Sequence, residues 1–261
     1  MSTIPLFAVA DLRYLIRRLL SRCLRCALRL RSRPYPMEPD TVMLVFSPHP
    51  DDEILGCGGL LTLKRSGGAA VHVVYITDGR ASHPGHPVLT PEAVAAQRQA
   101  EAQTAMDLVG VERAAVQFLG VPDGTLMHLD SPAADGLVSR IANVLRSTSP
   151  GEIFLPCRRD GSSEHDSAFS FVARALAQTG LQPRIMEFPV WSWWNPLLLI
   201  RPLFTCRRVW RMDFRGHENV KRQALAAYAS QVQPAPPWGK AVLSPEFVSF
   251  FLSPEEFFFE R

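Results

Sequence analysis

The 261-residue chain lacks the features of a membrane-spanning or secreted protein. In residues 10–33, arginines interrupt every apolar run before it reaches the roughly 20 residues that a transmembrane helix needs. A signal peptide requires an uninterrupted apolar core, which is also missing, so we expect neither feature. The five cysteines show no framework-like spacing, and we therefore expect reduced thiols in a cytoplasmic protein.

The main part of the chain also lacks a basic balance of charge. Residues 1–33 contain eight arginines and one aspartate, a net charge of +7. The whole chain carries +3, so residues 34–261 carry the difference, −4. A globular nucleic-acid-binding domain would present a basic patch, and we therefore expect no nucleic-acid partner.

Residues 10–33 predict an amphipathic helix, because arginines and apolar residues gather on opposite sides at about 100° per residue. The arginines are Arg18, Arg22, Arg25 and Arg29, and the apolar residues are Leu12, Leu15, Ile16, Leu19, Cys23, Cys26 and Leu30. The pattern is typical of a helix on an anionic membrane surface, here the inner face, with guanidinium groups towards lipid phosphates. Packing on the body or on a partner chain is the alternative. The proline-rich RSRPYPMEP predicts a linker, which divides the chain into residues 1–39 and a domain, 40–261.

The body alternates between apolar, β-rich runs and helical patterns. The expected strands lie at 42–47, 70–77, 115–119, 152–156, 185–190 and 208–213, and the expected helices near 53–66, 92–109, 134–147, 164–178 and 217–229. This alternation predicts an α/β, Rossmann-like fold with a mainly parallel sheet and helices on both faces. In such sheets ligands bind beyond the carboxyl ends of the strands. Polar clusters follow three of the expected strands, and we expect them to meet there: SPHPDDE, TDGRASHPGHP and RRDGSSEHDS.

The first of these clusters predicts a metal site. His49 and Asp52 are three positions apart in a turn stiffened by two prolines, so both can approach one small cation. A catalytic zinc typically takes three protein ligands, and His165 in the third cluster is the best-placed third ligand. Asp51 then remains free to accept a proton from metal-bound water. The alternative for the first cluster is a solvated acidic turn that caps a helix.

The stretch SPHPDDEILGCGG resembles the A-H-P-D-D-E signature of the PIG-L (LmbE-like) family of metal-dependent N-acetylglucosaminyl deacetylases. Weaker matches follow in family order, YITDG, QRQAE, FLGVPDG and KRQALAAYASQ, so the resemblance covers about residues 40–231. It implies a hydrolase that removes an N-acetyl group from an N-acetylglucosamine-type glycan or glycolipid. It also implies His49, Asp52 and His165 as metal ligands and Asp51 as the general base. Zn²⁺ is our working assignment, although Fe²⁺ suits the same ligands.

One motif departs from the family. Where relatives have H-P-D-H, this chain has SSEH at 162–165. The first histidine, which in relatives is thought to stabilise the oxyanion or protonate the amine, is Ser162, which cannot be a cationic acid. His83, His86 and His128 are other candidates for this role, with a surface-loop position as the alternative for each. The loss of an acid also leaves open a retired enzyme that binds metal and glycan at the membrane surface without turnover.

Two further features concern the substrate. Arg98 is a candidate for binding a phosphate or sugar, or for an ion pair with Glu101 on the same helix. The segment PVWSWWNPLLLIRPLF, residues 189–204, suits the core, a dimer contact in a homo-oligomer, or an apolar rim beside the site. Together with the basic helix it favours an N-acetylated amino-sugar conjugate that is lipid-linked.

Overall fold

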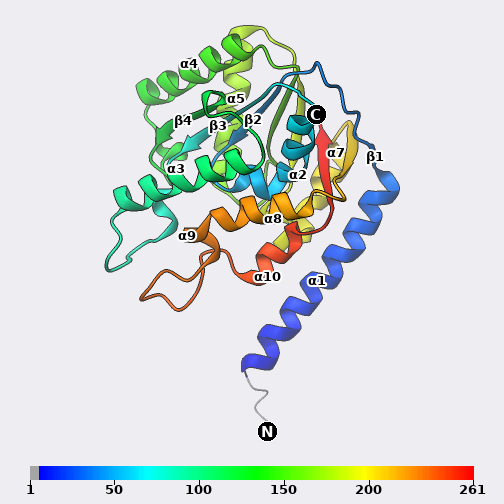
Figure 1. The fold of residues 1–261 in the computed structure, drawn as a ribbon, viewed down its shortest axis with the longest axis vertical. Coiled ribbons are helices and arrows are strands. Elements are labelled where there is room, and N and C mark those ends of the chain that lie inside the picture. The colour runs from blue at the N-terminus through cyan, green and yellow to red at the C-terminus, as the bar shows by residue number, and fades with distance from the viewer. Residues whose placement is uncertain (1–5) are drawn as a thin grey trace.

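An eight-stranded, mainly parallel sheet is the centre of the fold (Figure 1). The computed structural model describes the backbone of residues 6–261 and the side chains of residues 14–200 and 202–261. The strands are β1 (Arg33–Pro34), β2 (Met43–Ser47), β3 (Val71–Thr77), β4 (Val116–Val121), β5 (Glu152–Pro156), β6 (Arg184–Phe188), β7 (Arg208–Asp213) and β8 (Glu255–Glu260). Their order is β1-β7-β8-β6-β5-β2-β3-β4, and of the described strands β8 alone runs antiparallel to its neighbours.

Helices cover both faces of this sheet, which confirms the predicted α/β fold. The helices are α2 (Asp52–Ser66), α3 (Pro91–Leu108), α4 (Ser131–Thr148), α5 (Ser163–Thr179) and α8 (Glu218–Ala227), with short α6 (Trp191–Trp194), α7 (Ile200–Thr205), α9 (Ala229–Val232) and α10 (Pro245–Val248). The 3₁₀ helices are η1 (Arg80–Ser82), η2 (Arg113–Ala115), η3 (Leu126–His128), η4 (Pro196–Leu199) and η5 (Ser249–Phe251). Successive strand residues point to opposite faces, so Val45 packs in the core with α2, α3 and α8, whereas Leu44 packs with α4 and α5.

The first helix, α1 (Leu6–Arg31), lies along the outside of the body (Figure 1). Ser21 is buried and donates to the carbonyl group of Trp193 at 2.9 Å. Arg25 stacks on the same Trp193 ring at 4.0 Å, and Arg29 forms an ion pair with Glu255. The expectation that Arg25 and Arg29 point to lipid phosphates is therefore wrong, because the body supplies an aromatic face and a carboxylate for them.

The opposite side of α1 is exposed and apolar. Leu15 is 56% exposed, Leu19 62% and Leu30 89%. The side chain of Leu12, expected on the same face, lies outside those described. None of the helices in the described part of the chain is both long enough and apolar enough to cross a membrane.

Helix α2 approaches the sheet closely because two of its residues have no side chain. A Cβ atom at Gly56 would lie 1.9 Å from Cδ2 of Phe188, and one at Gly59 would lie 2.3 Å from Cδ1 of Phe214. The helix begins at Asp52, so this close approach also fixes the turn before it against the carboxyl edge of the sheet.

Replacing Gly56 with alanine should lower the free energy of unfolding by about 1–3 kcal/mol, because the new methyl group overlaps the buried ring of Phe188. Gly136 on α4 is the matched control, since nothing lies within 4 Å of a Cβ atom there. Gly136→Ala should instead raise stability by about 0.5–1 kcal/mol. Urea unfolding measures both changes. A Gly56→Ala protein as stable as the unchanged protein would show that α2 has room to move away.

Candidate metal centre

The candidate site lies where the strand order reverses. The chain runs from β2 outward to β3 and β4, then returns to β5 and β6 on the other side of β2. In open α/β sheets the loops on either side of such a point diverge, and ligands bind beyond the carboxyl ends of the strands there. His49 follows β2, and His165 stands in the first turn of α5, which follows β5. The topology therefore brings together two histidines that stand 116 positions apart in the sequence.

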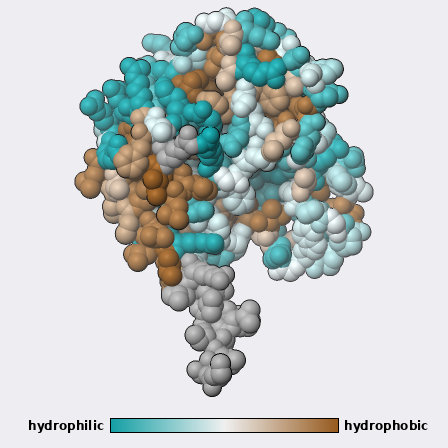
Figure 2. All heavy atoms as spheres, turned by 180° about the vertical axis from the view of Figure 1, so that it is seen from behind, coloured by the Kyte–Doolittle hydropathy of each residue, from teal (hydrophilic) through white to brown (hydrophobic). Residues whose placement is uncertain are grey.

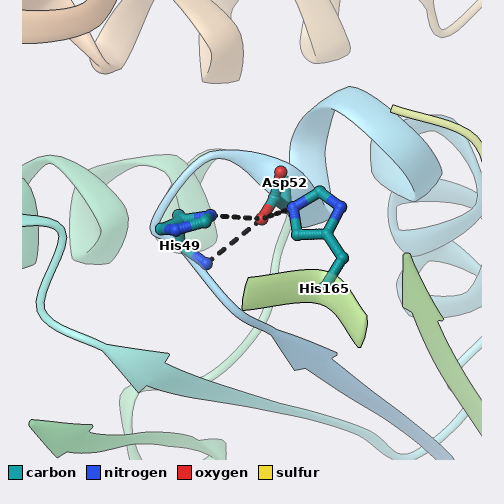
Figure 3. Close-up of side chains that lie close together, drawn as sticks. All are labelled: His49, Asp52 and His165. Atoms are coloured by element: carbon teal, nitrogen blue, oxygen red, sulfur yellow. Dashed lines mark hydrogen bonds and ion pairs between the residues drawn. The ribbon is translucent and has the colours of Figure 1, made fainter. Parts of the chain in front are cut away.

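The side chains of His49, Asp52 and His165 point toward one another (Figure 3). Oδ2 of Asp52 lies 3.2 Å from Nδ1 of His49 and 3.2 Å from Nε2 of His165. Two atoms bound tetrahedrally to one zinc ion at about 2.1 Å would be about 3.4 Å apart. Asp52 is thus about as far from each histidine as two ligands of one metal ion are, and the three ligand atoms all lie within 4.8 Å of one another.

His165 has the surroundings of a metal-binding histidine. Its ring is fully buried, and its Nδ1 lies 3.0 Å from Oδ1 of Asp160. Its Nε2 makes no hydrogen bond within the described residues, although Asp52 is near. A carboxylate that fixes one ring nitrogen and leaves the other free is the usual arrangement around a metal-binding histidine. Burial opposes a charge on this ring, but Asp160 and Asp52 outweigh it and raise the pKa of His165 well above its ordinary value.

Asp51 occupies a strained position next to these predicted ligands. Its φ angle of 139° is in the positive region that residues other than glycine rarely adopt. The fully buried carboxylate of Glu53 holds this turn, because it accepts the N–H of Asp51 at 3.1 Å. Glu53 also accepts from the hydroxyl groups of Ser47, at 2.9 Å, and of Tyr228. Strain that buried contacts maintain in this way is common at functional sites.

Arg98 binds the carboxylate of Asp51. Its Nη2 lies 2.9 Å from Oδ2 of Asp51, and both side chains are buried. The same guanidinium donates to main-chain carbonyl groups of two rim loops. Glu101, the alternative partner for Arg98, instead accepts from the backbone and hydroxyl of Ser230. Burial raises the pKa of Asp51 to about 7, although Arg98 acts in the opposite direction.

Two acidic residues of the site, Asp123 and Asp160, were not predicted from the sequence. Asp160 fixes His165, and Oδ1 of Asp123 lies 3.1 Å from Nε2 of His49. Glu164 forms with His49 and Asp123 a second group that could hold a metal ion. Their positions could have indicated them, because Asp123 and Asp160 lie in the loops that follow β4 and β5, on the rim where the predicted ligands meet.

The other predicted candidates lie around this centre. Ser162 caps α5, since its Oγ accepts the N–H of His165 at 3.4 Å. His83 and His86 are buried against the ring of Trp238, so a surface-loop position is wrong for both. Trp238 belongs to the C-terminal part of the chain, so the local sequence around the two histidines could not show that its ring packs on them. His128 is exposed, as that alternative predicted.

Comparisons with known proteins agree with the geometry. A family model described as PIG-L, GlcNAc-PI de-N-acetylase, matches residues 44–176. A 1D-myo-inositol 2-acetamido-2-deoxy-α-D-glucopyranoside deacetylase from Kineococcus radiotolerans is 35% identical over 91 residues. That match spans 34% of this chain and only 24% of the relative.

Two solved structures share the fold. An N,N′-diacetylchitobiose deacetylase from Pyrococcus horikoshii superposes with a TM-score of 0.57 and 19% identity, over 89% of this chain and 82% of that one. A 4-carboxy-2-hydroxymuconate hydratase from Pseudomonas putida KT2440 superposes with a TM-score of 0.60 and 19% identity, over 81% and 82%. At such identities the likeness concerns the fold alone.

Proposed function

The chain belongs to the PIG-L family, and from this premise we propose that it is a metal-dependent hydrolase that removes an N-acetyl group from an N-acetylglucosamine-type conjugate. One observation carries the proposal: His49, Asp52 and His165 converge, and the buried carboxylate of Asp51 stands beside them. The Kineococcus relative, named as a deacetylase of an acetamido-sugar conjugate, supports the substrate class. The fold by itself would not decide the reaction, because the hydratase shares it.

We assign the metal to His49, Asp52 and His165. Two imidazole nitrogens and one carboxylate oxygen suit Zn²⁺, our working choice, and equally suit Fe²⁺. When bound, such an ion activates a water molecule and polarises the acetyl carbonyl group. Asp160 keeps the ring of His165 in the orientation that presents Nε2 to the site.

Asp51 is the proposed general base. Arg98 and the turn held by Glu53 fix its carboxylate, and a pKa near 7 suits a group that must accept and then release a proton. After accepting the proton of the attacking water, the same carboxyl group can return it to the leaving amine. This second role replaces the acid that relatives place at the position of Ser162.

Arg98 and Ser162 each have a hydrogen-bond donor that remains available for the substrate. Nε of Arg98 is buried and has no hydrogen-bond partner in the described part of the chain, so it can donate to a sugar or phosphate oxygen. The hydroxyl of Ser162 accepts the N–H of His165 and still has its own proton to donate. We therefore propose that both residues contact the substrate.

We place the enzyme at the cytoplasmic face of an anionic membrane, with a lipid-linked conjugate as substrate. Residues 40–261 would form the deacetylase domain, and residues 10–33 would attach it to the surface. The expected linker between them is partly built into the domain, because its residues Arg33 and Pro34 form β1 beside β7. The exposed apolar side of α1, which includes Leu15, Leu19 and Leu30, supports this proposal. A second copy of the chain on that side, giving a homo-oligomer, is the alternative.

A metal- and glycan-binding protein without turnover is the second candidate function. It is favoured by Ser162, which stands where the family has a histidine. It is opposed by Asp51, since a binding protein has no use for a strained carboxylate held next to the metal ligands.

Acetate release tests the proposed function. We expect the zinc-loaded protein to release acetate from at least one member of a panel of N-acetylglucosaminyl inositols and glycolipids. A chelator should stop the reaction, and added Zn²⁺ should restore it. Stable metal binding with no acetate from any member would instead establish the second candidate.

A further inference from the structure

A cavity lined by four arginines lies beside α7, outside the candidate metal centre. Its volume is about 380 Å³, within the usual range for small-molecule sites. The arginines are Arg158, Arg159, Arg207 and Arg261, and the remaining lining residues are Pro202, Thr205 and Cys206. The four arginines come from three separate parts of the chain, which the fold brings together around one opening.

The described part of the chain does not neutralise all the positive charge of these arginines, and it leaves some of their N–H donors without an acceptor. Glu187 on β6 is fully buried and accepts from Nε of Arg158 at 3.0 Å and from Arg261. Nε of Arg261 has no hydrogen-bond partner among the described residues. Asp166 accepts the backbone N–H of Arg159, at 2.6 Å, while the side chains of Arg159 and Arg207 meet no acceptor in the described part of the chain. Guanidinium groups arranged in this way suit a phosphate, whose oxygens accept paired N–H bonds.

Figure 2 shows an exposed apolar surface on the side of the molecule where α1 and α7 lie. Helix α7 lines the cavity with Pro202 and exposes Ile200, at 50%, and Phe204, at 75%. Arg31 at the end of α1 lies over the ring of Phe204 at 5.7 Å, which joins α1 to α7. The exposed apolar side chains of this surface are Leu15, Ile16, Leu19, Leu20 and Leu30 of α1, Leu197 of η4, and Ile200 and Phe204 of α7.

We propose that the arginine cavity binds the phosphate of a membrane lipid while this apolar surface enters the bilayer. A phospholipid has a charged headgroup and an apolar chain. The guanidinium groups can donate hydrogen bonds to the phosphate of the headgroup, and the exposed leucine and phenylalanine side chains beside them can contact the apolar chain. Exposed Arg18 and Arg22 add positive charge on α1. A second copy of the chain fits less well, because a symmetric contact would bring two such positive surfaces together. The binding site goes beyond the proposed reaction and does not depend on it.

The test compares vesicles of phosphatidylcholine alone with vesicles that also contain phosphatidic acid. The variant Arg159→Gln/Arg207→Gln removes two side chains that have no acceptor among the described residues, so the fold should be preserved. Binding to the anionic vesicles should weaken about thirty-fold. The control variant, Arg113→Gln/Arg146→Gln, loses the same charge at exposed positions on η2 and α4 and should bind like the unchanged protein. Equal binding by the two variants would overturn the proposal.

A second arm separates a lipid from a soluble anion. Phe204→Ser should weaken binding to anionic vesicles about tenfold or more, because an apolar ring no longer enters the bilayer. Inorganic phosphate alone is the soluble probe, with thermal unfolding as the readout. Protection by phosphate together with no vesicle binding would overturn the proposal, because the cavity would then serve a soluble anion. A dimer that Phe204→Ser dissociates, again without vesicle binding, would overturn it as well.

Discussion

Replacing Asp51 with asparagine should lower turnover by about 10²–10⁴-fold and leave the metal content at the level of the unchanged protein. Asparagine has nearly the same shape and tolerates a positive φ angle better than most residues, so the turn should persist. Its amide cannot accept a proton, and its oxygen can still accept the hydrogen bond from Arg98. Acetate release and metal analysis on the same sample measure the two effects.

The control for this experiment is Asp135→Asn, which changes an exposed aspartate on α4 that pairs with Arg174. It should keep both turnover and metal. An Asp51→Asn protein that retains a tenth or more of the turnover would place the base elsewhere. If it loses metal as fully as a ligand variant does, Asp51 is itself a ligand and the assigned roles of the two aspartates are wrong.

The sheet and its main helices could be predicted because their signals are local. β2 and β3 are nearly continuous apolar runs that end at polar clusters, as expected for strands covered on both faces. β8 was missed although it contains three consecutive buried phenylalanines. Its antiparallel place between β6 and β7 depends on pairing with strands far earlier in the chain, which no local pattern shows.

The same distinction applies to α1 and to the site. The helical period showed that α1 has an arginine side and an apolar side, but it docks through a mixed stripe that includes Tyr14, Ser21 and Leu28. His49 and Asp52 are close in sequence, so their spacing was informative. Asp123 acts on His49 from another strand end, and only the strand order brings it there.

The two groups of residues that could hold the metal share His49 and predict different outcomes. Asp52→Ala should lower metal affinity by more than the roughly 10–100-fold that removal of an outer partner costs, and activity should fall with it. Asp52 supplies the oxygen that lies 3.2 Å from both histidines, so two imidazoles alone would remain. Two protein ligands are fewer than catalytic zinc sites use.

Asp123→Ala is the matched substitution in the second group, and it should keep most of the bound metal. Asp123 contacts Nε2 of His49, the nitrogen that faces away from Asp52, so its loss should cost at most the roughly 10–100-fold of an outer partner. Titration of both variants with Zn²⁺ and Fe²⁺ against a competing chelator measures the difference. The opposite order, with metal lost from Asp123→Ala and kept by Asp52→Ala, would move the ion to Asp123 and Glu164. His165 would then be a buried histidine that Asp160 and Asp52 hold for structural reasons alone.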